Sequence, residues 1–283
     1  MVGVFNRPLL ATEHSEFDTG AQALAFAIAR RCGLPLAAVL PLVSNPEFET
    51  VAPQLAALAE AEVSRKRQSL LASAQAAGVP FDLRVRRGAE PYLEIVEEAR
   101  ARGADLIVIR RRGKRGLLAN LLVGEMVGKV VAHAPCSVLI APRGATMWCH
   151  AVLVGIDPLA PDSRSLLNLA SALAAECGLP LRVLCVAGNQ AARPAAARAL
   201  AVALAQARQR CADADGELRI GRPHQALLDS AQACGADLLV VGRHGGDRLG
   251  RAWLGGTAQK VIGLAACPVL VHVNNPQPMS GQP

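Results

Sequence analysis

Glycines at a regular spacing mark the loop of this chain that is best suited to bind phosphate. The run Val241-Gly242-Arg243-His244-Gly245 is followed, after nine further residues, by Gly255-Gly256-Thr257, where a helix is predicted to begin. Glycine lets the backbone turn sharply and approach a ligand closely. The first amides of a helix have no partner within it, and the helix dipole favours anions there. The Thr257 hydroxyl adds a hydrogen bond to a phosphate oxygen or to a metal ion bound to it.

Alternating strands and helices in the second half of the sequence would position this loop. Strands are predicted over residues 151–156, 181–186, 217–220, 237–241 and 269–273, and helices over 163–176, 194–211, 223–234 and from about 257. The strands are near-continuous apolar runs, which is typical of strands buried on both faces. The alternation predicts a parallel, doubly wound sheet, in which ligands bind beyond the carboxyl ends of the strands near the topological switch point.

The first half of the chain repeats the second. Cys32-Gly33-Leu34-Pro35-Leu36 returns at 177–181, and the segment 103–108 returns at 235–240 with one substitution, in the same order. Strands are therefore expected at 9–12, 36–43, 82–85, 105–109 and 138–141. The sequence predicts an α/β protein of two doubly wound domains, 1–143 and 149–275, each with a five-stranded parallel sheet flanked by helices.

Three segments of the second half match a known pattern: Gly242-x-x-Gly245-x9-Gly255, then 257–261, then 266–270. Together they resemble the nucleotide-binding signature of the universal stress protein family. The resemblance covers nearly the whole chain, twice over, and implies an adenine-nucleotide alpha hydrolase-like fold. ATP-binding members of that family hold the triphosphate with this loop and lack a catalytic centre of the usual hydrolase type. The resemblance therefore implies ATP or a related adenine nucleotide, with or without Mg²⁺, in the C-terminal domain.

The resemblance also implies a set of site residues. These are Asp157, Cys185, Val186, Gly242, His244, Gly245, Gly255, Gly256, Thr257 and Ala258. Asp157 would lie near the adenosine, the backbone of the second strand would meet the adenine, and the glycine-rich segments would line the ribose and phosphates. The family usually has Ser or Thr where this chain has Gly256, so one hydroxyl is lost and a lower affinity is expected. Asp157 before Pro158 also fits an ordinary turn, His244 also fits a loop histidine without ligand contact, and Trp253 is interpreted as a packing residue.

The matching loop of the first copy departs from the pattern. Arg110 replaces the first glycine, Glu125 replaces the hydroxyl residue, and Thr12-Glu13 stands in place of the aspartate. Because a carboxylate at Glu125 would repel phosphate, no ATP is expected here in the ordinary pose. The basic run Arg110 to Arg115 either attracts another anion or forms a solvated, partly salt-bridged loop with Glu125, and the second interpretation is favoured.

Composition and residue spacing argue against a nucleic-acid-binding, membrane or metal-binding protein. The formal net charge of +7 is shared between the halves, without a basic tail for nucleic acid, and no apolar run is long enough to span a membrane. With no signal-peptide layout, a cytoplasmic protein is expected. The eight cysteines form no C-x-x-C pair and are expected to be small buried hydrophobes, and the histidines have no ligand spacing, so no metal site is expected.

Three functions remain. The first is a stress-response regulatory protein that binds an adenine nucleotide in its C-terminal domain. The second is a scaffold or interaction protein with both sites idle. The third, a slow ATPase, ranks last because no positioned general base is evident. The family resemblance also implies that the two domains pair through their last strands, with a homodimer of whole chains as a further arrangement.

Overall fold

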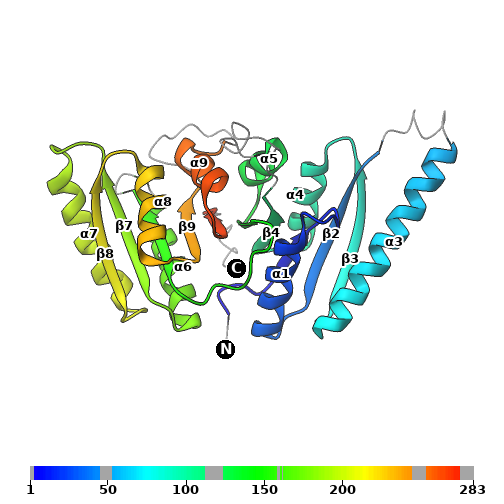
Figure 1. The fold of residues 1–283 in the computed structure, drawn as a ribbon, viewed down its shortest axis with the longest axis horizontal. Coiled ribbons are helices and arrows are strands. Elements are labelled where there is room, and N and C mark those ends of the chain that lie inside the picture. The colour runs from blue at the N-terminus through cyan, green and yellow to red at the C-terminus, as the bar shows by residue number, and fades with distance from the viewer. Residues whose placement is uncertain are drawn as a thin grey trace, which may run out of the picture.

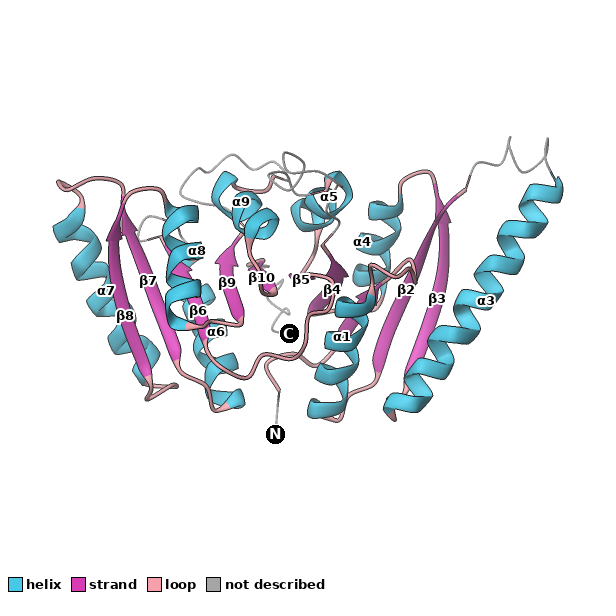
Figure 2. Ribbon diagram, in the orientation of Figure 1, coloured by secondary structure: helices cyan, strands magenta, loops and turns pink. Residues whose placement is uncertain are grey.

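The computed structural model of the chain describes residues 3–44, 53–111, 124–157, 160, 162–243 and 253–274. These residues form one sheet with helices on both faces (Figures 1 and 2). His244, Gly245 and the part of the basic loop beyond Arg111 lie outside the described residues.

Each half of the chain forms a parallel sheet. The strands of the first half are β1 (Pro8–Ala11), β2 (Leu36–Val43), β3 (Phe81–Gly88), β4 (Leu106–Arg110) and β5 (Ser137–Ala141). Those of the second half are β6 (Val152–Ile156), β7 (Leu181–Ala187), β8 (Ala214–Ile220), β9 (Leu238–Gly242) and β10 (Val269–His272). The two halves have the same strand order, β3-β2-β1-β4-β5 and β8-β7-β6-β9-β10. The predicted α/β class with parallel, doubly wound sheets is confirmed.

Helices cover the two faces of the sheet with separate cores. The helices are α1 (Thr19–Cys32), α3 (Pro53–Ala77), α4 (Pro91–Ala101), α5 (Glu125–His133), α6 (Ser163–Cys177), α7 (Arg193–Arg208), α8 (Pro223–Cys234) and α9 (Gly256–Leu264). Buried residues of α1, α6 and α7 belong to one core, and those of α4, α5, α8 and α9 belong to the other. Strands between these layers are buried on both faces, which explains their apolar runs.

The outer strands β3 and β8 differ from the central ones. Most of their residues are partly buried or exposed, since each strand lies at an end of the sheet. β8 begins at Ala214, earlier than the predicted residue 217, because Asp215 and Gly216 interrupt the apolar run by which a strand is recognised in the sequence.

The two halves join through their last strands. β5 and β10 pair in antiparallel fashion, with Leu139 opposite Leu270, so the ten strands form one continuous sheet. The predicted pairing of the two copies is therefore present within a single chain. In Figure 1 the two halves lie side by side, and α5 and α9 lie next to each other near the middle of the view.

Two arginines fasten each half to the other. Arg243, after β9, donates from Nη1 to the carbonyl oxygens of Ala132 (3.3 Å) and Ala134 (3.4 Å), at the end of α5. Arg111, after β4, donates from Nη1 to the carbonyl oxygens of Ile262 (3.4 Å) and Ala265, at the end of α9. A cation at a helix C-terminus satisfies free carbonyl groups and the negative end of the dipole.

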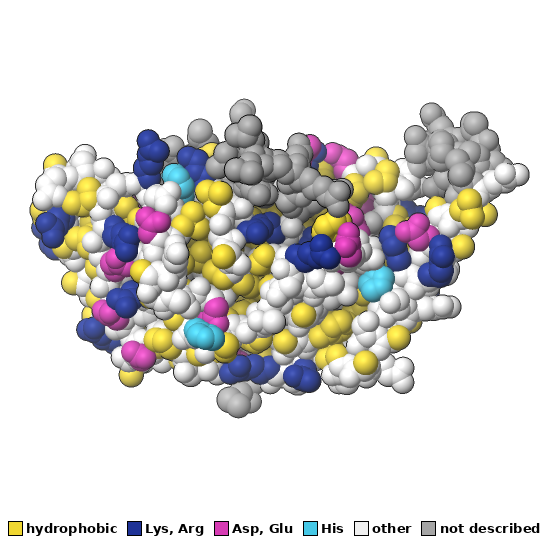
Figure 3. All heavy atoms as spheres, in the orientation of Figure 1, with side chains coloured by type: hydrophobic (Ala, Val, Ile, Leu, Met, Phe, Trp, Pro, Cys, Tyr) yellow, Lys and Arg dark blue, Asp and Glu magenta, His cyan; other side chains and the backbone are white. Residues whose placement is uncertain are grey.

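Charged side chains are spread over the surface seen in Figure 3. Lysine and arginine alternate there with acidic side chains and with apolar patches. None of the described helices is both long and apolar enough to cross a membrane.

Candidate functional site

A cavity of about 270 Å³ lies at the carboxyl ends of the central strands of the second half. β6 pairs with β7 on one side and with β9 on the other, so the chain reverses direction of winding at this point. This is the switch point at which open α/β sheets leave a crevice. The lining residues are Gly155, Ile156, Asp157, Leu184, Val186, Pro223, Leu227, Val241, Gly242, Arg243, Trp253, Gly255, Gly256, Thr257 and Ala258.

The start of α9 forms one wall of this cavity. Gly255 is the N-cap residue, no side chain caps the helix, and the first helical hydrogen bond runs from the Gln259 amide to the Gly255 carbonyl (2.9 Å). The amides of Gly256, Thr257 and Ala258 precede that bond and therefore have no acceptor within the helix. They are oriented as donors for an anion, and the helix dipole adds to their attraction.

Two glycines that line the cavity, Gly256 and Gly155, have different roles. A Cβ atom built on Gly256 would meet no heavy atom within 4 Å, so the space above the first turn of α9 is open. A Cβ atom on Gly155 would lie 2.7 Å from Leu227 Cδ2, so this glycine lets α8 pack against β6. Gly256 therefore leaves room for a ligand or a larger side chain, whereas Gly155 serves packing.

Asp157 and Arg243 place opposite charges around the cavity. Asp157 follows β6, and its carbonyl accepts hydrogen bonds from the Ala160 amide (3.0 Å) and the Ser163 hydroxyl. Burial lowers the pKa of the Arg243 guanidinium from its ordinary value, and Asp162 acts in the opposite direction. An arginine remains charged at neutral pH despite such a shift. Arg243 thus lines the cavity at the end of β9, while its guanidinium donates to carbonyl groups at the end of α5.

Most of the predicted residues meet in this cavity. Those that line it are Asp157, Val186, Gly242, Gly255, Gly256, Thr257 and Ala258. Cys185 does not line it, because its side chain is fully buried in the core on the opposite face of the sheet. The prediction for Cys185 concerned its backbone, and that stays a prediction. His244 and Gly245 lie outside the described residues.

The sequence interpretation missed several lining residues. Leu184 lies two residues before the predicted Val186 in β7, so the period of a strand would have placed it on the same face, towards the cavity. Pro223, at the start of α8, also lines the cavity and was not predicted as a site residue. Trp253 lies on the cavity wall and is 52% exposed, so its interpretation as a packing residue describes only part of its position.

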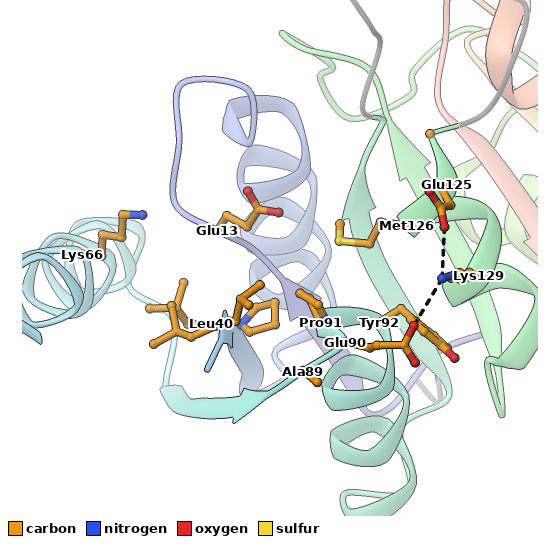
Figure 4. Close-up of a pocket in the computed structure, with 14 residues that line it drawn as sticks. Glu13, Leu40, Lys66, Ala89, Glu90, Pro91, Tyr92, Glu125, Met126 and Lys129 are labelled. Carbon is orange, nitrogen blue, oxygen red and sulfur yellow. Dashed lines mark hydrogen bonds and ion pairs between the residues drawn. The ribbon is translucent and has the colours of Figure 1, made fainter. Parts of the chain in front are cut away.

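The first half has a larger cavity, of about 800 Å³, at the corresponding strand ends. Glu13, Glu90 and Glu125 bring carboxylates to its wall, together with Lys66 and Lys129. Figure 4 shows Lys129 between Glu125 and Glu90, with Nζ–O distances of 3.1 and 3.3 Å. Glu125 stands at the first position of α5, where Gly256 stands in α9. A phosphate at the start of α5 would meet this carboxylate.

Arg110 occupies the end of β4, where Gly242 ends β9. Its guanidinium donates to Glu13 Oε2 (2.5 Å) and Ser15 Oγ (2.6 Å) and lies 3.5 Å from Asp18 Oδ2. The expectation of a solvated basic loop is wrong for Arg110, which is 3% exposed, although the expected salt bridges are present. A buried arginine must be paired, and the two carboxylates of the first copy provide the pairing.

The cysteines also depart in part from expectation. Cys136, Cys185 and Cys211 are buried, as expected of small hydrophobes, but Cys149 is exposed. Burial raises the pKa of the Cys185 thiol to about 11 and that of Cys136 to about 12. These two thiols are therefore protonated at neutral pH and poor nucleophiles.

The model of the universal stress protein family matches the chain twice, over residues 5–142 and 149–272. The chain belongs to this family. A universal stress protein of Synechocystis is 27% identical over 167 residues, which is 59% of this chain and 57% of that protein. One of Thermus aquaticus is 44% identical over 57 residues, which is 20% of this chain and 42% of that protein. The chain thus spans about half the length of the curated relatives that it matches.

Solved structures match this universal stress protein over nearly its whole length. A universal stress protein from Archaeoglobus fulgidus has a TM-score of 0.68 at 19% identity, covering 95% of this chain and 96% of that one. A functionally unknown protein from Pseudomonas aeruginosa has a TM-score of 0.69 at 19% identity, covering 95% and 93%. At this identity the likeness shows the fold, which includes both copies of the domain.

Proposed function

We propose that this universal stress protein is a stress-response regulatory protein that binds ATP or a related adenine nucleotide in its C-terminal domain, residues 149–275. The observation that carries the proposal is the open N-terminus of α9, where three amides without helical acceptors border a cavity at the switch point of β6 and β9. Such a set of amides binds phosphate through hydrogen bonds and the helix dipole together.

The lining of the cavity away from α9 is suited to binding an adenosine. Leu184, Val186 and Leu227 give it an apolar side, which suits a purine ring, and Asp157 offers a carboxylate for a ribose hydroxyl. In this arrangement the base lies over β7 and the phosphates extend towards α9. Mg²⁺ would be held by the phosphates and the Thr257 hydroxyl.

The N-terminal domain takes no ATP in this proposal. Arg110 and its carboxylate partners occupy the end of β4, and Glu125 opposes a phosphate at α5. The protein therefore binds one nucleotide per chain. The role of the first domain is to complete the ten-stranded sheet and to cap α9 through Arg111.

Calorimetric titration of the whole chain with Mg-ATP tests the proposal. One site per chain is expected, and Gly255→Val should abolish it by placing a side chain among the phosphate-binding amides. The spectrum of Trp253 offers a second signal, because the other tryptophan, Trp148, is 4% exposed and lies in the core. If the chain binds no adenine nucleotide, with or without Mg²⁺, the scaffold function is favoured. Sustained phosphate release would favour the ATPase.

A further inference from the structure

An exposed thiol, an imidazole and a carboxylate meet where the linker enters the second domain. Cys149 Sγ lies 3.0 Å from His150 Nδ1, which lies 3.2 Å from Asp237 Oδ2. The three atoms all lie within 4.8 Å of one another. We propose that Cys149, His150 and Asp237 form a binding site for a divalent cation of the Zn²⁺ class, separate from the nucleotide cavity.

The three donors suit this ion in kind, and two of their separations are close to those that it needs. Zn²⁺ binds thiolate, imidazole nitrogen and carboxylate oxygen in tetrahedral geometry, with bonds of roughly 2.0–2.3 Å that place the donor atoms about 3.3–3.6 Å apart. The observed separations of 3.0 and 3.2 Å need to widen by only a few tenths of an ångström. The side chain of His150 is 72% exposed and can make that adjustment, and solvent supplies the fourth ligand.

The carboxylate is already fixed in place. Asp237 Oδ2 accepts hydrogen bonds from the amides of Cys149 (2.6 Å) and His150 (2.9 Å), and Oδ1 accepts one from Ala151 (3.1 Å). Burial acts to raise the pKa of Asp237, but these hydrogen bonds outweigh it and hold the pKa below its ordinary value. The carboxylate is therefore ionised before a cation arrives, and the same bonds bring Cys149 and His150 beside it.

The first domain shows which of these groups the fold itself requires. There Asp105, before β4, accepts hydrogen bonds from the amides of Asn6 (2.7 Å) and Arg7 (3.0 Å) in the same arrangement. Neither of these residues brings a thiol or an imidazole. The carboxylate and the amides are thus enough to anchor the chain, and Cys149 and His150 are additions that supply metal donors.

Binding involves no change of oxidation state. The cation takes the place of the thiol proton of Cys149, which is released to solvent, and the neutral imidazole donates its Nδ1 lone pair. The bound ion would tie the linker to the start of β9, since Asp237 directly precedes that strand.

Titration of the reduced, untagged chain with Co²⁺, followed by Zn²⁺, tests this site. We expect one Co²⁺ per chain with a thiolate-to-cobalt absorption band that Zn²⁺ abolishes by displacement. Cys149→Ser should lose the band, and His150→Ala should weaken binding by tenfold or more. Both residues are exposed, so both variants should keep the melting temperature of the metal-free protein.

Cys32→Ser is the matched control. Cys32 is a partly exposed thiol whose Sγ lies 4.0 Å from a carboxylate oxygen of Glu176. Among the described residues, Cys32 does not belong to the group of metal donors. This variant should keep the band. The proposal is overturned if the parent chain shows no band, if binding requires millimolar metal, if the band survives Cys149→Ser, or if it disappears in Cys32→Ser.

Discussion

Replacing Gly256 offers a direct test of phosphate binding at α9, because two substitutions at this position should change affinity in opposite directions. A Cβ atom here meets nothing within 4 Å, and the residue is exposed at the first helical position, so both variants should fold. Gly256→Ser adds a hydroxyl beside the free amides. A hydrogen bond to a charged group contributes about 1.5–3 kcal/mol, which is roughly a 10- to 150-fold gain in affinity for Mg-ATP.

Gly256→Glu copies the residue that the first domain has at this position. A carboxylate about 5 Å from a phosphate charge costs between about 1 kcal/mol in water and about 3 kcal/mol near a protein surface. Because Gly256 is exposed, the lower part of this range applies to each phosphate charge, and a loss of at least about tenfold is expected for ATP. The helix itself tolerates the change, since an acidic residue in the first turn is favoured by the dipole.

Isothermal titration of both variants and the parent chain gives the affinities and the stoichiometry. Glu125→Gly is the control in the other domain, and it should leave the stoichiometry at one because Arg110 still occupies the end of β4. Equal affinities for the serine and glutamate variants of Gly256 would refute the placement of phosphate at the start of α9.

Three further predictions test buried charged and titratable side chains of the fold. Arg110→Ala leaves the buried carboxylate of Asp18 unpaired and should lower the free energy of unfolding by about 3 kcal/mol in urea titration, with partial recovery when Asp18→Asn is added; no loss would contradict the buried ion pair. Arg243→Ala and Arg111→Ala each remove carbonyl hydrogen bonds at a helix end and should cost about 1–2 kcal/mol, but only the first should weaken ATP binding, as Arg243 alone of the two lines the cavity. Burial lowers the pKa of His272, with Asp162 opposing it, so the unfolded chain takes up that proton first as pH falls through about 6.5; the parent chain should then lose more stability than His272→Gln between about pH 6.5 and 5, and parallel melting curves would contradict this.

The sequence was sufficient to predict the fold class and to select several residues that line one cavity in the structure. Apolar runs separated by helical patterns indicate strands buried between two layers of helices. This pattern is local, so it can be recognised in the sequence without knowing any distant contact. The strand order then places the ends of β6 and β9 together, so glycines near Gly242 and Gly255 had to face the same crevice. Cys185 illustrates the limit, since the choice of face along β7 depends on which layer packs against it.

Other features were decided by the tertiary structure. In the sequence, Arg110 resembles part of a solvated basic run. The fold brings the carboxylates of Glu13 and Asp18 to it, and these ion pairs offset the cost of burying its charge. Cys149 and His150 had no ligand spacing in the sequence, and Asp237 lies 88 and 87 residues further along the chain, respectively. The physical reason is the same in both cases. Hydrophobic periodicity is local and can be read along the chain, whereas the environment of a charge depends on the partners that folding brings to it from distant segments.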